Sequence, residues 1–322
     1  MKICLYPSII KPMKMGGIKT AFEHKKQALS INEIQYSCHP FIHSFDILHL
    51  ECPTPQSAFY ALWAKKKGKK VVMSIHVTAE DFKETYTFGK RTVTFLQRYL
   101  TWYYSLADLL VAPSDYTKKL VRQYGVKKPI KVISNGLHSS FVNNNQHNTR
   151  NLQDIPIIGT VGYVTRRKGV ITFCNIAKQF PTLDFQWAGA VHDRLLFDTK
   201  SIDIPDNVKL LGYVSNIKDL YRSFTVFLFP SYEENQGIVL LEAASFGLPL
   251  IIRDLPVYEG WLIHKENCLK CSNEKEFIDH LKSILNDETL REKLGKNARK
   301  LAEKNDIAVI GKKLITCYNQ VL

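Results

Sequence analysis

Short apolar runs alternate with stretches of helical periodicity along this chain, in two blocks. Each run has the length and the aliphatic content of a buried strand. Five runs form the first block: ICLYP (3–7), FDILHL (45–50), KVVMSIH (70–76), LLVAPS (109–114) and IKVISNG (130–136). Five more form the second: IIGTVGY (157–163), LDFQWAG (183–189), VKLLGYV (208–214), VFLFPS (226–231) and LPLIIRD (248–254). This alternation predicts an α/β fold with two Rossmann-like parallel-sheet domains.

A polar stretch separates the two blocks. Residues 139–156, SSFVNNNQHNTRNLQDIP, are rich in Asn and Gln and are typical of a linker. We therefore place the first domain at 1–142 and the second at 156–305. Parallel sheets bind ligands at the carboxyl ends of their strands, so we expect the active site in a central cleft that both domains face.

Composition narrows the class of protein. The 322 residues contain no run of 18 apolar residues, and the start, MKICLYPSIIKPMK, lacks the apolar stretch and cleavage site of a signal peptide. We therefore expect a cytoplasmic protein. Seven scattered cysteines fit a reducing compartment. No second Cys or His pair accompanies the CxxC of Cys268 and Cys271, so we interpret both as isolated thiols.

The positive charge lies mostly in the first half. Residues 1–136 hold 21 Lys and Arg against 9 Asp and Glu, whereas residues 137–322 hold 23 against 21. This excess favours a polyanionic partner, either nucleic acid or an anionic membrane face. The sequence has no RNP strand, zinc-finger spacing or GXXG clamp, so we expect no nucleic-acid partner. The basic clusters are Lys65, Lys66, Lys67, Lys69 and Lys70, then Lys90, Arg91 and Arg98, then Lys118, Lys119, Arg122, Lys127, Lys128 and Lys131.

The stretch FGKRTVTFLQRYLTWYYSLADLL (88–110) bears on the choice of partner. Its aromatic and basic residues mix at helical spacing, which is typical of a helix at a lipid interface. An ordinary amphipathic helix with its aromatic residues in the core explains the stretch equally well. The one-sided charge favours the membrane. The residues concerned are Phe95, Leu96, Tyr99, Trp102 and Tyr103, with Lys90, Arg91 and Arg98.

The segment EENQGIVLLEAASFGLP (233–249) carries the strongest candidate chemistry. A helix is expected from near Gly237 to Gly247, with Glu234 before it and Glu242 inside it. The unpaired amides of its first turn suit a phosphate. The order of these groups along the chain, a carboxylate, then the helix amides, then a second carboxylate, matches the order of sugar, diphosphate and ribose in a nucleotide sugar. The spacing alone favours two solvated glutamates on a short surface helix.

The residues around these glutamates resemble the E-x7-E motif of retaining GT-B glycosyltransferases of family 4. Further motifs follow in family order: PSDYTKKLV (113–121), ISNG (133–136), VGYVTRRKGV (161–170), VKLLGYV (208–214) and FPS (229–231). The resemblance implies a GT-B fold, a UDP-sugar donor, retention of configuration and no metal ion or other cofactor. It also implies that 306–322 form a helix packing back on the first domain. No Asp-x-Asp occurs, which disfavours the metal-dependent GT-A class.

The resemblance assigns donor-side roles to individual residues. Glu234 is expected to bind hydroxyls of the transferred sugar, Glu242 to hold the ribose, and Lys168 to neutralise the leaving phosphate. The diphosphate is expected to meet the amides of Gly237, Ile238 and Val239.

One family residue is absent from the donor side. Tyr163 stands where the family has an arginine, five positions before Lys168. Arg167 is a candidate substitute, with a surface role as the alternative.

The first domain has candidates too. Gly16 and Gly17, after Met15, resemble the flexible loop that approaches the donor phosphate, although a Gly pair is also an ordinary turn. His76 ends a predicted strand where the family has a histidine close to the transferred sugar; a core histidine is the alternative. Glu80 and Asp81 follow it and are candidates for contact with the acceptor.

The acceptor is also suggested by resemblance. FDILHL, AKKKGKKVV with its following histidine and AEDF, and DLLVAPSDYTKKLVRQYGVKKPIKVISNG resemble bacterial enzymes that add a second sugar to monoglucosyl-diacylglycerol and bind anionic lipid through a basic first domain. We expect a hexose, glucose in the first place, to move from UDP-glucose or UDP-galactose to this membrane glycolipid, on the inner face of the plasma membrane. A soluble transferase extending a polysaccharide and a non-transferase such as a nucleotide-sugar epimerase are the alternatives.

Overall fold

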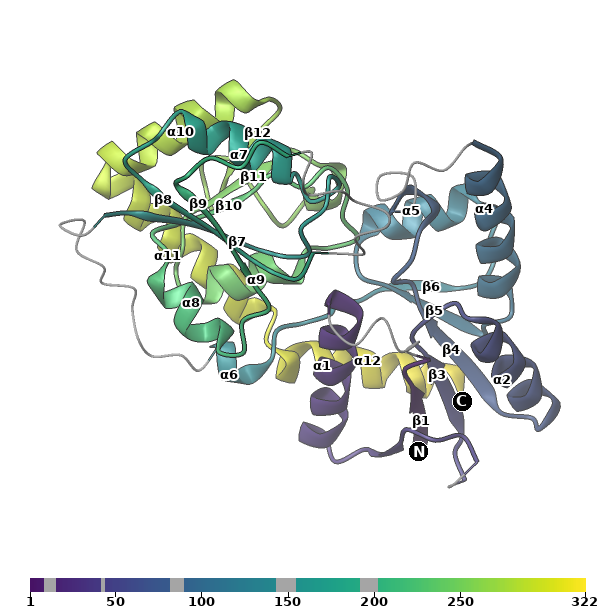
Figure 1. The fold of residues 1–322 in the computed structure, drawn as a ribbon. Helices are drawn as coiled ribbons and strands as arrows, with labels where there is room; N and C mark the ends of the chain where they lie inside the picture. Colours follow the sequence, from purple (N-terminus) through teal and green to yellow (C-terminus); the bar gives the residue numbers. More distant parts are fainter. Residues whose placement is uncertain (9–15, 42–43, 82–89, 143–154, 192–201) are drawn as a thin grey trace. The chain divides into compact units, whose positions relative to one another are not determined.

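The chain folds into two compact units (Figure 1). The computed structural model describes residues 1–8, 16–41, 44–81, 90–142, 155–191 and 202–322. Met1–Lys83, Thr87–Ser139 and Asn305–Leu322 form the first unit, and Ser140–Lys304 belong to the second. Most of the predicted linker lies outside the described residues, and its first residues form a short helix, α6 (Ser139–Val142).

The first unit is built on a parallel sheet. Its strands lie in the order β2-β1-β3-β4-β5-β6. Helices α1 and α12 share one core cluster with the sheet, and α2 and α4 share another, so helices cover both faces. The strands are β1 (Lys2–Tyr6), β2 (Gln35–Ser37), β3 (Ile47–Leu50), β4 (Lys70–Ser74), β5 (Leu109–Ala112) and β6 (Ile130–Val132). The helices are α1 (Gly17–Ile31), α2 (Pro55–Lys66), α4 (Lys90–Ser105), α5 (Asp115–Gln123) and α12 (Ile307–Val321).

The second unit repeats this plan. Its parallel strands lie in the order β12-β11-β10-β7-β8-β9. The strands are β7 (Ile157–Val161), β8 (Asp184–Ala188), β9 (Val208–Gly212), β10 (Val226–Phe229), β11 (Leu250–Arg253) and β12 (Leu269–Cys271). The helices are α7 (Val170–Lys178), α8 (Ile217–Ser223), α9 (Ile238–Ser245), η3 (Pro256–Tyr258), α10 (Glu274–Asn286) and α11 (Glu288–Lys304).

The predicted α/β class with two parallel sheets is confirmed, and each of the ten predicted strands has a counterpart. Most of the observed strands are shorter than predicted, and several end before the last residues of the predicted run. KVVMSIH is one example: β4 stops at Ser74, so the prediction that His76 ends the strand was wrong by two residues. The short strands β2 and β12 were not predicted.

Helix α4 divides the aromatic residues of 88–110 between two environments. Tyr103 is 1% exposed and packs in the core, which contradicts its expected place at a lipid interface. Phe95 and Trp102 are 72% and 48% exposed. Leu96 and Tyr99 are partly buried against the core. The predicted interfacial face is therefore narrower than the sequence suggested.

Candidate functional site

Two loops at the carboxyl edge of the second sheet form one half of the candidate site. One follows β7 and the other follows its neighbour β10. The amide of Tyr232 donates to the carbonyl of Arg167 at 2.7 Å. Gly169 is required where the loops cross, because it has φ 82° and a Cβ there would lie 2.3 Å from the carbonyl oxygen of Pro230. These contacts hold the predicted site residues of both loops together.

Lys168 and Glu234 meet as a buried ion pair. The ammonium of Lys168 donates to Oε1 of Glu234, and the two side chains are 13% and 7% exposed. The hydroxyl of Ser231 donates to the same oxygen at 2.7 Å, and Lys168 Nζ lies 5.3 Å from the centre of the Phe229 ring. Burial alone would raise the pKa of Glu234, but Lys168 and Arg167 hold it below its ordinary value. The structure thus places an ionised carboxylate beside a cation.

Helix α9 begins beside this pair. Gly237 caps it in the left-handed conformation, with φ 86° and ψ 65°, where glycine is favoured. The amides of Ile238 and Val239 lie in the first turn and have no acceptor within the helix. The predicted helix from near Gly237 to Gly247 is confirmed within two residues. Its start therefore offers the amides that a phosphate group needs.

Glu242 lies within α9 and is 8% exposed. The Tyr221 hydroxyl donates to its Oε2 at 2.7 Å. Burial raises the pKa of Glu242, and the bond from Tyr221 only partly opposes this. The two glutamates of the motif thus differ: Glu234 is paired with the ammonium of Lys168, and Glu242 is paired with a neutral hydroxyl.

Arg167 points toward the β10 loop. Its Nη1 donates to the carbonyl of Glu233 at 2.7 Å, so its side chain braces the loop that carries Glu234. Tyr163 is half-buried, and burial raises its pKa.

One residue near α9 was missed by the sequence analysis. The Tyr258 hydroxyl is buried, has no hydrogen-bond partner among the described residues, and would lie 3.7 Å from a Cβ on Gly237. No pattern in the sequence distinguishes Tyr258 from an ordinary core tyrosine.

The first unit holds the remaining candidates. Gly16 caps α1 with φ 107°, and Gly17 is the first residue of that helix; Met15 lies outside the described residues. Asp81 accepts a bond from the Thr78 hydroxyl at 3.1 Å, and Glu80 accepts one from the Tyr124 hydroxyl. Both candidate acceptor carboxylates are thus engaged with neighbouring side chains.

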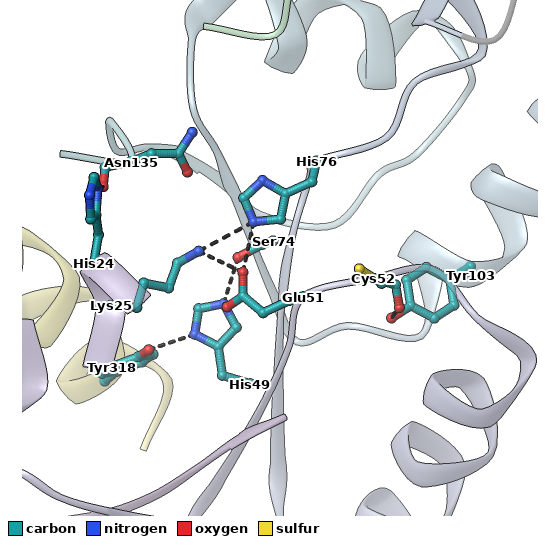
Figure 2. Close-up of polar contacts among 10 residues, drawn as sticks. All are labelled: His24, Lys25, His49, Glu51, Cys52, Ser74, His76, Tyr103, Asn135 and Tyr318. Carbon is teal, nitrogen blue, oxygen red and sulfur yellow. Dashed lines mark hydrogen bonds and ion pairs between the residues drawn. The ribbon is translucent and has the colours of Figure 1, made fainter. Parts of the chain in front are cut away.

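His76 lies in a buried polar cluster that the sequence did not reveal (Figure 2). Its Nε2 is 2.7 Å from Oε2 of Glu51, which follows β3, and the same oxygen is 2.7 Å from Nζ of Lys25 on α1. Burial, and next the charge of Lys25, lower the pKa of His76, so the ring is neutral near pH 7. A carboxylate just after a buried strand was the available signal for Glu51.

The described residues include neither a membrane-crossing helix nor a cluster of metal-binding side chains. No helix there is both long and apolar enough to cross a bilayer. No group of three or more His, Cys, Asp or Glu side chains there is arranged to hold a metal ion. Cys268 and Cys271 are free buried thiols.

Comparison with known proteins shows the family. Residues 35–141 match the model described as Glycosyltransferase Family 4, and residues 142–301 match Glycosyl transferases group 1. The processive diacylglycerol alpha-glucosyltransferase of Acholeplasma laidlawii is 32% identical over 100% of this chain and 99% of its own length. The chain belongs to the family 4 glycosyltransferases. It is therefore a glycosyltransferase, as its motifs predicted.

Further similarities agree with this family assignment. The alpha-galactosylglucosyldiacylglycerol synthase of Streptococcus pneumoniae is 34% identical over 32% of this chain and 30% of its own. HepE of Anabaena, crystallised with UDP and with UDP-glucose, superimposes with a TM-score of 0.78 at 17% identity, covering 99% of this chain and 100% of HepE. The sucrose-phosphate synthase of Thermosynechococcus elongatus has a TM-score of 0.80 at 16% identity, covering 99% of this chain and 98% of its own. These neighbours confirm the GT-B fold for this glycosyltransferase.

Proposed function

We propose that this glycosyltransferase moves a hexose, glucose foremost, from a UDP-sugar to monoglucosyl-diacylglycerol, with retention of configuration. The observation that carries the donor side is the Lys168–Glu234 pair beside the start of α9. The full-length similarity to a diacylglycerol alpha-glucosyltransferase supports the lipid acceptor. UDP is the first nucleotide to test, since HepE was crystallised with it.

The donor side divides into three parts. Glu234 accepts hydrogen bonds from hydroxyls of the hexose, and Glu242 accepts them from the ribose. The amides of Gly237, Ile238 and Val239 and the ammonium of Lys168 face the diphosphate. Negative charge grows on this group as the sugar leaves, so a cation there stabilises the transition state more than the ground state. Arg167 keeps Glu234 in place through the carbonyl of Glu233.

The mechanism we propose needs no enzymic nucleophile. The leaving diphosphate oxygen takes the proton of the attacking hydroxyl on the same face of the sugar, which gives retention. Lys168 and the helix amides together offset the leaving charge, so the proposal includes no metal ion. Activity should therefore persist in excess EDTA.

The acceptor side belongs to the first unit. We propose that His76 contacts the transferred sugar and that Glu80 and Asp81 contact the acceptor headgroup. Gly16 and Gly17 belong to the backbone that approaches the donor phosphate.

An apolar and basic face of the first unit supports a place on the membrane. Phe59 and Leu62 of α2 are 60% and 50% exposed, and Phe95 and Trp102 of α4 are also exposed. The Tyr99 hydroxyl donates to the carbonyl of Pro53, which ties α4 to the start of α2. Aromatic residues beside basic ones suit an anionic lipid surface. We call this surface, with Lys66, Lys67 and Arg98, the α2–α4 face, and we place the enzyme through it on the inner face of the plasma membrane.

A UDP-release assay tests the function. It pairs UDP-glucose and UDP-galactose with monoglucosyl-diacylglycerol in anionic vesicles, with diacylglycerol, and with a polysaccharide acceptor. We expect release with a UDP-hexose only when monoglucosyl-diacylglycerol is present, and an α-linked product by NMR. Release with the polysaccharide alone would instead establish the soluble transferase, and no release with any pair would contradict the transfer.

A further inference from the structure

The cluster around His76 contains a buried pair of opposite charges, Lys25 and Glu51, whose presence a contribution to folding stability does not explain. The Glu51 side chain is 0% exposed and that of Lys25 is 7% exposed, at an Nζ to Oε2 distance of 2.7 Å. Removing such a pair from water costs about as much as its attraction returns, and apolar residues of similar volume often stabilise a fold as well. The pair therefore calls for a second role, which its neighbours indicate.

The first neighbour is His76, whose Nε2 shares the Oε2 atom of Glu51 with Lys25 (Figure 2). Burial would raise the pKa of Glu51, but the charge of Lys25 and then the neighbouring histidines hold it well below its ordinary value. An ionised carboxylate only accepts hydrogen bonds, so the bond at 2.7 Å requires the proton on Nε2 of His76. Lys25 Nζ lies 3.4 Å from Nε2 of His76, and both nitrogens then donate to the same oxygen of Glu51 rather than to each other. Nδ1 is consequently the acceptor nitrogen of this neutral ring.

The second neighbour is His49 of β3, which lies behind Glu51. Its Nε2 is 2.8 Å from the Ser74 hydroxyl and 3.5 Å from Oε1 of Glu51. Its Nδ1 is 2.5 Å from the hydroxyl of Tyr318, which lies on α12 and comes 269 residues later in the chain. Burial lowers the pKa of His49 to about 3, so this ring is also neutral. Hydrogen bonds thus hold the His49 ring between Tyr318 of α12 and Ser74 of β4, and the ring lies against Oε1 of Glu51, which has no hydrogen-bond partner among the described residues.

We propose that Glu51 is a positioning residue for the transfer reaction: it holds His76 in one orientation as the Nε2–H tautomer. Lys25 keeps Glu51 ionised, and the His49 ring, held by Tyr318 and Ser74, packs against the far side of its carboxylate. The inference rests on the proposed function, in which His76 contacts the transferred sugar. A ring with a fixed acceptor nitrogen binds one hydroxyl arrangement better than a ring that exchanges tautomers, so the expected consequence lies in kcat.

The test uses the full chain with ¹⁵N-labelled histidine. Long-range ¹H–¹⁵N spectra report the tautomer of each ring, and UDP release reports kcat and KM. The main variant is Lys25→Met with Glu51→Leu, which removes both charges and retains most of the volume. We expect a melting temperature close to that of the wild type, a mixed tautomer at His76, a kcat at least tenfold lower and an unchanged KM for the donor.

A matched control lies on the same helix. Glu23 and Lys26 of α1 form an exposed pair at 2.9 Å, and Glu23→Leu with Lys26→Met should leave the tautomer and kcat as in the wild type. If the main variant does not fold, Glu51→Gln serves instead. Its amide has nearly the same shape and can both donate and accept, so the same loss of a single tautomer and of kcat is expected.

The outcomes separate the two proposals. A His76 that stays entirely in the Nε2–H form in the folded variant, or a kcat within twofold of the wild type, overturns the positioning role. A kcat that falls while the tautomer is unchanged also overturns it, because the charge pair would then act by another route. Absence of transfer by the wild type contradicts the proposed function, and the tautomer measurement still decides whether Glu51 fixes the ring.

Discussion

Each unit buries a glutamate beside a lysine at the carboxyl edge of its parallel sheet, yet the two pairs differ in access. Glu51 and Lys25 are 0% and 7% exposed, and two histidines surround the carboxylate. Glu234 and Lys168 are 7% and 13% exposed and lie beside the amides of a helix start. The first pair is therefore the more closed of the two, and the second, which is more exposed, is the pair that we propose faces the donor.

This difference indicates how each pair contributes. The Lys168 side chain is partly exposed, and in the proposed function its ammonium offsets the charge that appears on the leaving group. Glu51 contacts only protein, so any effect on a reaction passes through His76. Under both proposals, the same pair of residue types serves direct electrostatics in one unit and orientation of a second residue in the other.

Breaking the closed pair, Lys25 and Glu51, should give the largest change in the free energy of unfolding. Lys25→Met leaves Glu51 buried without its cation, and we expect it to lower the free energy of unfolding by about 3–5 kcal/mol. Urea denaturation measures this. The neighbouring Lys26→Met removes a partly exposed cation and should cost less than about 1 kcal/mol. Equal losses of stability in the two variants would contradict the expectation that burial makes the loss of the Lys25 cation more costly.

Breaking the open pair, Lys168 and Glu234, should mainly affect catalysis. Lys168→Ala removes the cation that we propose faces the leaving group, and we expect kcat to fall by about 10²–10³. UDP release under saturating donor measures this. Lys178→Ala removes a surface pair with Asp203 and is the matched control, with activity expected within twofold. A Lys168→Ala enzyme that retains a third of wild-type kcat would contradict its proposed role.

The surfaces of the two units offer a third comparison. Phe95→Ser with Trp102→Ser removes exposed apolar area from the α2–α4 face, and we expect about tenfold weaker binding to phosphatidylglycerol vesicles. Sedimentation with vesicles at low salt measures this, and the melting temperature should not change. Ile263→Ser is the control, because Ile263 is 46% exposed in the second unit. Unchanged binding of the double variant would show that the lipid contact does not lie on the α2–α4 face.

Glu242 should give the smallest change, in the pH dependence of stability. Its pKa is raised in the folded state, so the folded chain binds more protons between the ordinary value near 4.5 and the raised value. Stability from this group therefore falls as pH rises through that window, by about 1.4 kcal/mol for each unit of the shift. Glu242→Gln removes this fall. Urea midpoints from pH 4 to 8 should decrease less in the variant than in the wild type. Parallel curves would show that folding does not raise the pKa of Glu242.

The sequence predicted the sheets well and the closed pair not at all. Apolar runs mark buried strands, but QYS and LKC are too short to show a period, so β2 and β12 escaped notice. Glu234 and Lys168 were found because each sits in a local motif. Lys25 is one of many lysines in the first unit, and nothing nearby in sequence shows that it is buried. Tyr318 meets His49 only through the return of α12, which no local pattern encodes.

That return of α12 affects how the protein is made. Between the synthesis of His49 and Tyr318, 269 positions apart, the ribosome must translate the whole second unit. At about 5–20 residues per second this takes roughly 10 to 50 s. During this time the sheet face that α12 later covers, with Ile3 and Leu5 among its residues, lacks that cover. We expect a nascent chain that needs chaperone protection, and a fragment ending at residue 139 that aggregates when expressed alone.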